Sequence, residues 1–115
     1  MSITRHDPGS ILSQAVVHGD TVYLAGIVAK DLKKDVKGQT KEVVDEIDRL
    51  LAKCGSNKSK ILSATIWVTD IRNRAAMNEV WTAWVDTKNL PARACVEAAL
   101  ADPAALVEIM VTAAK

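Results

Sequence analysis

The hydrophobic residues change their spacing from one segment of the chain to the next, and two segments carry a helical pattern. In residues 43–54 the apolar side chains recur along one stripe of a helix: Val43, Val44, Ile47, Leu50, Leu51 and Cys54. Gly55 follows, where a left-handed residue would end the helix. Because the stripe lasts too few turns for a coiled coil, we expect this helix to cover a sheet.

A second helix is predicted from about residue 72 to residue 86. Its apolar positions are Met77, Val80, Trp81 and Trp84. Tryptophans can indicate stacking on a base or a cofactor, but on a helical stripe they are typical of a hydrophobic core. Asn78 on the same helix is of a residue type that normally lies at the surface.

Elsewhere the apolar residues alternate with a period of two, which is typical of β-strands. Residues 13–17 and 21–25 predict a hairpin about the turn His18-Gly19-Asp20. Gly26 interrupts the second run and indicates either a bulge or kink, or a place where a ligand approaches the backbone closely. Residues 61–69 carry apolar bulk on both faces and predict a central strand.

Two polar segments carry no such pattern. Residues 1–11 contain the breaker Pro8-Gly9 and are expected to form a loosely held lead-in. Residues 30–38 are rich in lysine and aspartate and are expected to form a charged loop.

The C-terminal part of the chain predicts two further strands, at about residues 93–98 and 106–113. Alternation puts Arg93, Cys95 and Glu97 on one face of the first. If residues 101–103 form a turn and the two strands pair antiparallel, Arg93 and Glu108 face each other. A charge in an apolar strand is costly to desolvate, so this pair either fixes strand register or a subunit contact, or it serves a functional site.

These elements follow the order β-β-α-β-α-β-β and predict a single α+β domain over residues 1–115, with a mixed sheet. Two helices can cover only one face of such a sheet. The side chains expected on the other face are Trp67, Leu106, Met110, Arg93, Cys95 and Glu108. A monomer rarely leaves such a patch in water, so we expect another subunit to cover it. The pattern predicts an oligomer without fixing its number of subunits.

Composition narrows the possible classes of function. The 115 residues are 49% hydrophobic and 25% charged, with a net charge of +1, so no charge excess indicates a nucleic-acid or membrane-surface partner. No apolar run reaches the ~18 residues of a transmembrane helix and the start lacks a signal-peptide core, so we expect a cytoplasmic location. Cys54 and Cys95 are expected to be reduced thiols, and His6 and His18 lack the spacing of a metal site.

The strongest motif lies in the two C-terminal strands. The sequence Pro-Ala-Arg-Ala-Cys-Val-Glu-Ala at residues 91–98, followed by Leu-Val-Glu-Ile at residues 106–109, resembles the C-terminal signature of the Rid family, the reactive-intermediate deaminases also grouped as YjgF/YER057c/UK114 proteins. The spacing from Arg93 to Glu108 matches the deaminase members of that family. Chain length, element order and the sequence Val-Tyr-Leu-Ala-Gly at residues 22–26 fit as well, so the resemblance spans nearly the whole chain.

The resemblance implies a chorismate-mutase-like fold, assembled as a homotrimer with three clefts between neighbouring subunits. It also implies a deaminase that needs no cofactor and hydrolyses 2-aminoacrylate, 2-iminobutanoate and related 2-imino acids to 2-oxo acids and ammonia. Arg93 would clamp the substrate carboxylate with its planar fork of donors, and Glu108 would activate the attacking water. Gly26 would let the substrate approach closely, Cys95 would line the cleft, and Asn78 would lie near the site.

Two positions depart from the best-known branch of the family. Leu12 stands where that branch has a tyrosine, and Ile27 where a glutamine is common. Both border the expected cleft, so they indicate a side branch whose preferred imino acid the motifs do not fix. Two other functions stay open: a non-catalytic protein that binds or senses small 2-oxo and carboxylic acids, and an endoribonuclease or translation inhibitor. The neutral charge and the lack of a basic stripe count against the last of these.

Overall fold

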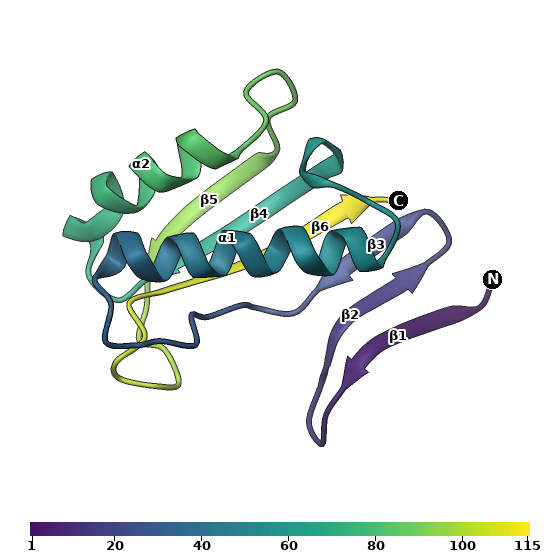
Figure 1. Cartoon of the computed structure of the whole chain (residues 1–115), viewed down its shortest axis with the longest axis horizontal. Helices are drawn as coiled ribbons and strands as arrows, with labels where there is room; N and C mark the ends of the chain where they lie inside the picture. The colour runs from purple at the N-terminus through teal and green to yellow at the C-terminus, as the bar shows by residue number, and fades with distance from the viewer.

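Two helices lie against one face of a six-stranded sheet in the computed structural model, which describes every residue from Met1 to Lys115 (Figure 1). The strands are β1 (Ile3–Pro8), β2 (Ser13–His18), β3 (Thr21–Leu24), β4 (Ile61–Val68), β5 (Ala92–Glu97) and β6 (Val107–Ala114). The helices are α1 (Val36–Lys53) and α2 (Arg74–Trp84), and short 3-10 turns lie at Lys58–Lys60 and Ile71–Asn73. The predicted mixed sheet with both helices on one face is therefore confirmed.

The strands are ordered β1-β2-β3-β6-β4-β5 across the sheet. Strands β4 and β5 run parallel and are joined through α2, while all the other neighbouring strands are antiparallel. The predicted hairpin is formed by β2 and β3, and β4 lies inside the sheet between β6 and β5, as its two apolar faces predicted. A helix between β4 and β5 returns the chain to the end where β4 began, which makes the pair parallel.

The predicted pairing of the last two strands is wrong, because β4 lies between β5 and β6. Arg93 on β5 is in register with Ala64 of β4, whereas Glu108 on β6 is in register with Trp67 of β4. Alternation identifies the two faces of a strand but carries no information about which strand pairs with it.

The N-terminal segment is also more ordered than expected. Residues Ile3–Pro8 form β1, which pairs antiparallel with β2 at the edge of the sheet. The structure thus has one strand more than the predicted order. Most residues of β1 are exposed to solvent, so no alternation of buried and polar residues marks the strand in the sequence.

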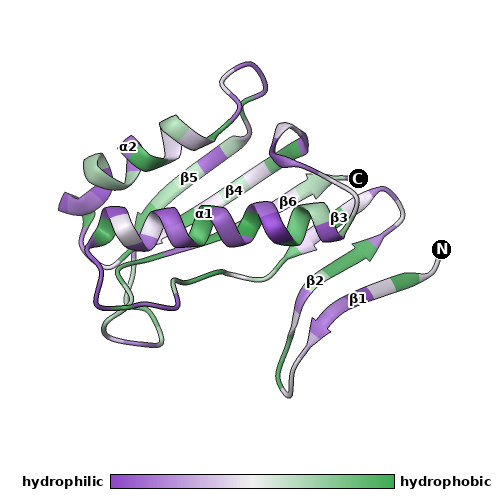
Figure 2. Ribbon diagram, in the orientation of Figure 1, coloured by the Kyte–Doolittle hydropathy of each residue, from purple (hydrophilic) through white to green (hydrophobic).

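The core lies between the helices and the covered face of the sheet. Figure 2 shows hydrophobic and hydrophilic bands alternating along α1, and its buried side chains include Val43, Ile47 and Leu50. The helix begins at Val36, inside the predicted charged loop, because the side chain of Asp35 accepts a hydrogen bond of 2.8 Å from Gly38 N. Gly55 follows the helix with φ 78°, as predicted. Neither α1 nor α2 combines the length and hydrophobicity needed to cross a lipid bilayer.

Candidate functional site

Arg93 lies on the edge strand β5 and points to the helix-covered side of the sheet. Its register partner Ala64 is buried on that side, and side chains directly opposite each other share a face. The Arg93 NH1 group donates a hydrogen bond of 2.8 Å to Oδ1 of Asn78 on α2. Its remaining donors, Nε and NH2, donate to no protein atom, and the side chain is exposed. Arg93 is therefore held at one end of its guanidinium and open at the other.

Asn78 and Trp81 are one helical turn apart on α2, so their side chains are neighbours on the helix surface. The guanidinium carbon of Arg93 lies 5.4 Å from the centre of the Trp81 ring. Trp81 belongs to the core, as predicted, but the sequence analysis missed its contact with Arg93. The three-residue spacing of Asn78 and Trp81 indicated that both side chains lie on one side of α2. It points to Arg93 only once β5 is known to lie beside this helix.

Cys95 and Glu97 follow Arg93 on the same face of β5, in register with Ile66 and Val68. Cys95 is half-buried and packs against the core as a free thiol. Glu97 accepts a hydrogen bond of 2.9 Å from Ile71 N, so it holds the turn before α2 instead of only reaching solvent.

Glu108 lies on the opposite face of the sheet from Arg93. Its neighbours Val107 and Ile109 are buried beneath the helices, so alternation along β6 turns Glu108 to the face that carries no helix. The carboxylate of Glu108 makes no hydrogen bond or ion pair with a side chain of its own chain. The prediction that Arg93 and Cys95 share a face with Glu108 is therefore wrong for a single chain.

The open face does carry the expected apolar side chains in part. Trp67 and Met110 lie beside Glu108 on this face, and Tyr23 and Val96 add exposed hydrophobic surface to it. Leu106, which was also expected here, packs against the core ahead of β6.

Gly26 lies directly under the Glu108 carboxylate. A Cβ atom at this position would collide with Oε2 of Glu108, so the close approach depends on glycine. Tyr23 pairs with Thr112 of β6, and Ile27 pairs with Ile109 of the same strand. The chain advances by four residues from Tyr23 to Ile27 while β6 advances by only three. The extra residue makes the segment around Gly26 a β-bulge. The predicted bulge is confirmed, whereas the approach of a ligand to Gly26 stays a prediction.

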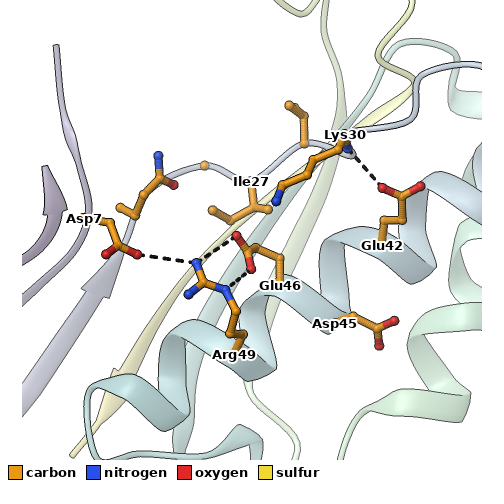
Figure 3. Close-up of a pocket in the computed structure, with 10 residues that line it drawn as sticks. Asp7, Ile27, Lys30, Glu42, Asp45, Glu46 and Arg49 are labelled. Carbon is orange, nitrogen blue, oxygen red and sulfur yellow. Dashed lines mark hydrogen bonds and ion pairs between the residues drawn. The ribbon is translucent and has the colours of Figure 1, made fainter. Parts of the chain in front are cut away.

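A cleft of about 780 Å³ lies between α1, the end of β1 and the segment that begins at Gly26 and Ile27 (Figure 3). Arg49 on α1 bridges Glu46 and Asp7 there, and Lys53 also pairs with Asp7. The Lys53 and Arg49 cations lower the pKa of Asp7, and Arg49 lowers the pKa of Glu46.

These ion pairs engage the Asp7, Glu46 and Arg49 side chains of the cleft, and neither Arg93 nor Glu108 lines it. We therefore assign the network to holding β1 against α1, and we place the candidate chemistry at Arg93 and Glu108 despite the size of this cleft. The structure contains no cluster of three or more histidine, cysteine or acidic side chains that could hold a metal ion.

Comparison with known proteins gives one consistent result. The family model described as Endoribonuclease L-PSP matches residues 3–115. The chain is 46% identical to a RutC family protein of Haemophilus influenzae over 98% of each chain, and 43% identical to the RutC family protein YoaB of Escherichia coli over 99% of each.

Solved structures agree with these sequence relatives. A member of the YjgF protein family from Neisseria meningitidis superposes with a TM-score of 0.97 at 43% identity, covering 100% of this chain and 96% of that one. A YjgF/YER057c/UK114 family member from Mycobacterium tuberculosis gives 0.90 at 30% identity, over 99% and 100% of the two chains. These similarities confirm the fold class predicted from the sequence.

Proposed function

The chain belongs to the Rid (YjgF/YER057c/UK114) family, whose family model is described as Endoribonuclease L-PSP, and we propose that it hydrolyses small reactive 2-imino acids to 2-oxo acids and ammonia. The observation that carries the proposal is an arginine fixed at one end by Asn78 and open at the other. Substrates of this class, such as 2-aminoacrylate and 2-iminobutanoate, are small and carry one carboxylate. No cofactor enters the proposed reaction.

Arg93 binds the carboxylate in this proposal. Because Asn78 engages NH1, the Nε and NH2 groups remain as two parallel donors with the spacing of two carboxylate oxygens. The bidentate pair would fix the substrate in one plane, with Cys95 lining the site beside Arg93. An arginine that is already held loses less side-chain entropy on binding than a free one.

Glu108 moves the proton in the hydrolysis. Water attacks the imine carbon as Glu108 takes a proton from it, and the carbon becomes tetrahedral. Glu108 gives this proton to the nitrogen. It then takes the remaining proton from the new hydroxyl and passes it to the same nitrogen, so the carbon–oxygen double bond forms as the carbon–nitrogen bond breaks, ammonia leaves and the 2-oxo acid remains. A carboxylate that no side chain of its own subunit engages is free to act as this base, and Gly26 gives it room to lie close to the backbone.

The two groups would meet between subunits. Arg93 and Glu108 lie on opposite faces of one sheet, so one chain cannot direct both at a single small substrate. The exposed apolar side chains of the open face, Tyr23, Val96 and Met110, support an assembly that covers this face. We propose a homotrimer in which Arg93, Asn78 and Cys95 of one subunit meet Glu108 and Gly26 of its neighbour.

The test of function is a coupled assay. A threonine dehydratase supplies 2-iminobutanoate, and the decay of imine absorbance is followed with and without the protein. The proposal expects decay faster than spontaneous hydrolysis, proportional to protein concentration. A decay rate equal to the spontaneous one, with several amino-acid precursors and with calorimetric binding of pyruvate intact, would instead identify a protein that binds or senses 2-oxo acids.

The description Endoribonuclease L-PSP supports a second candidate function, cleavage of RNA. The net charge of +1 provides little attraction for a phosphate backbone. Incubation with labelled RNA distinguishes the candidates, because a real nuclease activity would survive repurification and disappear in a point variant of its site.

A further inference from the structure

The Arg93 guanidinium that the proposed reaction uses lies over the ring of Trp81, and we propose that Trp81 is a positioning residue for Arg93. The consequence for substrate binding rests on the proposed function, whereas the effect on Arg93 itself does not. Trp81 would not touch the substrate. It would act by restricting where the Arg93 guanidinium can lie.

The geometry around Arg93 restricts it from two directions. Asn78 accepts a hydrogen bond of 2.8 Å from NH1 of Arg93, and this bond fixes the NH1 end of the guanidinium. The guanidinium carbon lies over the Trp81 ring, 5.4 Å from its centre, and the negative face of the ring attracts the cation. A long arginine side chain otherwise samples many rotamers, and a hydrogen bond at one nitrogen still leaves rotation about that bond.

Arg93 is mounted on an edge strand, where few neighbours could hold it. Its register partner on β4 is Ala64, whose side chain ends at Cβ, and no strand lies on the other side of β5. The support for the guanidinium therefore comes from α2 alone. The adjacent positions Asn78 and Trp81 provide it from consecutive turns.

Trp81 is itself held firmly enough to serve as a support. It is only 5% exposed, and its ring lies 5.4 Å from the ring of Trp84 at an angle of 59°. The Trp84 Nε1 group donates a hydrogen bond of 2.9 Å to Asp48 on α1. These contacts place both indoles in the core between the helices, and of the two only Trp81 contacts Arg93.

This arrangement leaves one approach to Arg93 for a ligand. Asn78 takes one end of the guanidinium and the Trp81 ring lies on one side of the cation, so a carboxylate meets the remaining Nε and NH2 donors. Without Trp81 the same donors would be present but not oriented. The expected loss is therefore in affinity for the carboxylate, with a smaller loss in the turnover of bound substrate.

Binding experiments compare Trp81→Leu and Trp81→Phe with the matched control Trp84→Phe. Trp84 lies one turn further along α2 and is 7% exposed, so its replacement disturbs the core to a similar degree without touching Arg93. In calorimetric titrations with pyruvate, Trp81→Leu should weaken binding about 2- to 30-fold, the range of a cation–π contact. Trp81→Phe should recover part of this affinity, and Trp84→Phe should stay within about 2-fold of wild type.

A spectroscopic measurement tests the contact without any ligand. The Nε–Hε resonance of Arg93, assigned by its disappearance in Arg93→Lys, should be displaced in wild type by the ring current of Trp81. The displacement should vanish in Trp81→Leu, shrink in Trp81→Phe and persist in Trp84→Phe.

The resonance and binding measurements test the role of Trp81 separately from the proposed imine hydrolysis. An undisplaced Arg93 resonance in wild type overturns the inference even if Trp81→Leu fails to fold, and so does wild-type affinity for pyruvate in a folded Trp81→Leu. If wild type neither binds 2-oxo acids nor accelerates imine hydrolysis, the proposed function fails. The resonance then still decides whether Trp81 holds Arg93.

Discussion

The Arg93 region and the Glu108 region are built in opposite ways. Arg93 is exposed but has two partners in its own chain: Asn78 accepts a hydrogen bond from its guanidinium, and the Trp81 ring lies beneath the cation. Glu108 is half-buried but has no hydrogen-bonding or charged side-chain partner, and the backbone at Gly26 lies close to its carboxylate. A group that must bind a fixed shape benefits from being held, whereas a group that must exchange protons benefits from being unpaired. The contrast therefore matches the two roles that we propose.

The ion pairs of Asp7, Arg49 and Glu46 provide a third case for comparison (Figure 3). Each charge there has an opposite charge within its own chain, and the network connects two elements of the fold. Neither Arg93 nor Glu108 has such a partner. Their lack of an ion pair in the single chain distinguishes them from the paired charges of this network.

Replacement of Arg93 should have the largest effect. Arg93→Ala removes the two donors that face the carboxylate, so binding of pyruvate and turnover of imine should both fall roughly 30- to 1,000-fold. Calorimetry and the coupled assay measure these losses. Arg74→Ala is the matched control, since Arg74 is an exposed arginine on the same α2 that holds no partner, and it should leave both values unchanged. Wild-type affinity in Arg93→Ala would remove the clamp from the mechanism.

Replacement of Glu108 should separate binding from turnover. Glu108→Gln keeps size and hydrogen bonding but removes the base, so turnover should fall roughly 100-fold or more while pyruvate still binds. Binding that is tighter than in wild type would fit the loss of a negative charge near the ligand. A variant that hydrolyses imine at the wild-type rate would show that water is activated without Glu108.

A methyl group at Gly26 should have a smaller effect on the same half of the site. In Gly26→Ala the new Cβ meets the flexible end of Glu108, which can move aside, so we expect a loss of stability below about 1 kcal/mol and a fall in turnover of roughly 10-fold. Gly9→Ala is the control, because a Cβ there makes only ordinary contacts. Urea unfolding and the coupled assay are read together. Unchanged turnover would mean that Glu108 acts from another position.

Replacement of Asp7 should leave turnover unchanged and alter stability only. Lys53 and Arg49 lower the pKa of Asp7 below its ordinary value of 3.8, so this carboxylate contributes stability above that pH and loses the contribution as pH falls through its lowered pKa. Asp7→Asn should therefore be slightly less stable than wild type at pH 7, with a difference that disappears in strong acid. Asparagine also tolerates the φ of 50° at this position.

Urea unfolding of Asp7→Asn across pH checks this prediction. Asp20→Asn is the control, since Asp20 has no ion pair, and it should follow wild type at every pH. A stability difference that is independent of pH would assign the effect to the backbone conformation instead of to the ion pairs.

The elements predicted correctly are those whose buried face is marked by several apolar residues. The stripe of α1 and the two apolar faces of β4 are each marked by several residues, and both elements formed where they were predicted. Strand β1 was missed because this edge strand buries no apolar residue, so no alternation of buried and polar positions marks it.

The candidate site was predicted less completely, for a physical reason. The residue types of Arg93, Asn78, Gly26 and Glu108 can be read from the chain, but their relative placement depends on which strand pairs with which. The parallel pairing of β4 with β5 turns Arg93 to the helix side, whereas β6 turns Glu108 away from it. A register shift of one residue would have exchanged these faces, and periodicity alone does not detect such a shift.

In the proposed assembly one site combines Arg93 of one subunit with Glu108 of its neighbour, and mixing subunits of two variants measures this sharing. Arg93→Ala and Glu108→Gln chains are unfolded, combined in equal amounts and refolded together, and native mass spectrometry confirms that mixed oligomers form. In a cyclic oligomer roughly a quarter of the interfaces then contain both intact residues, so activity should return to roughly a quarter of the wild-type level, although each variant refolded alone stays inactive. Mixed oligomers that remain as inactive as the separate variants would contradict the account.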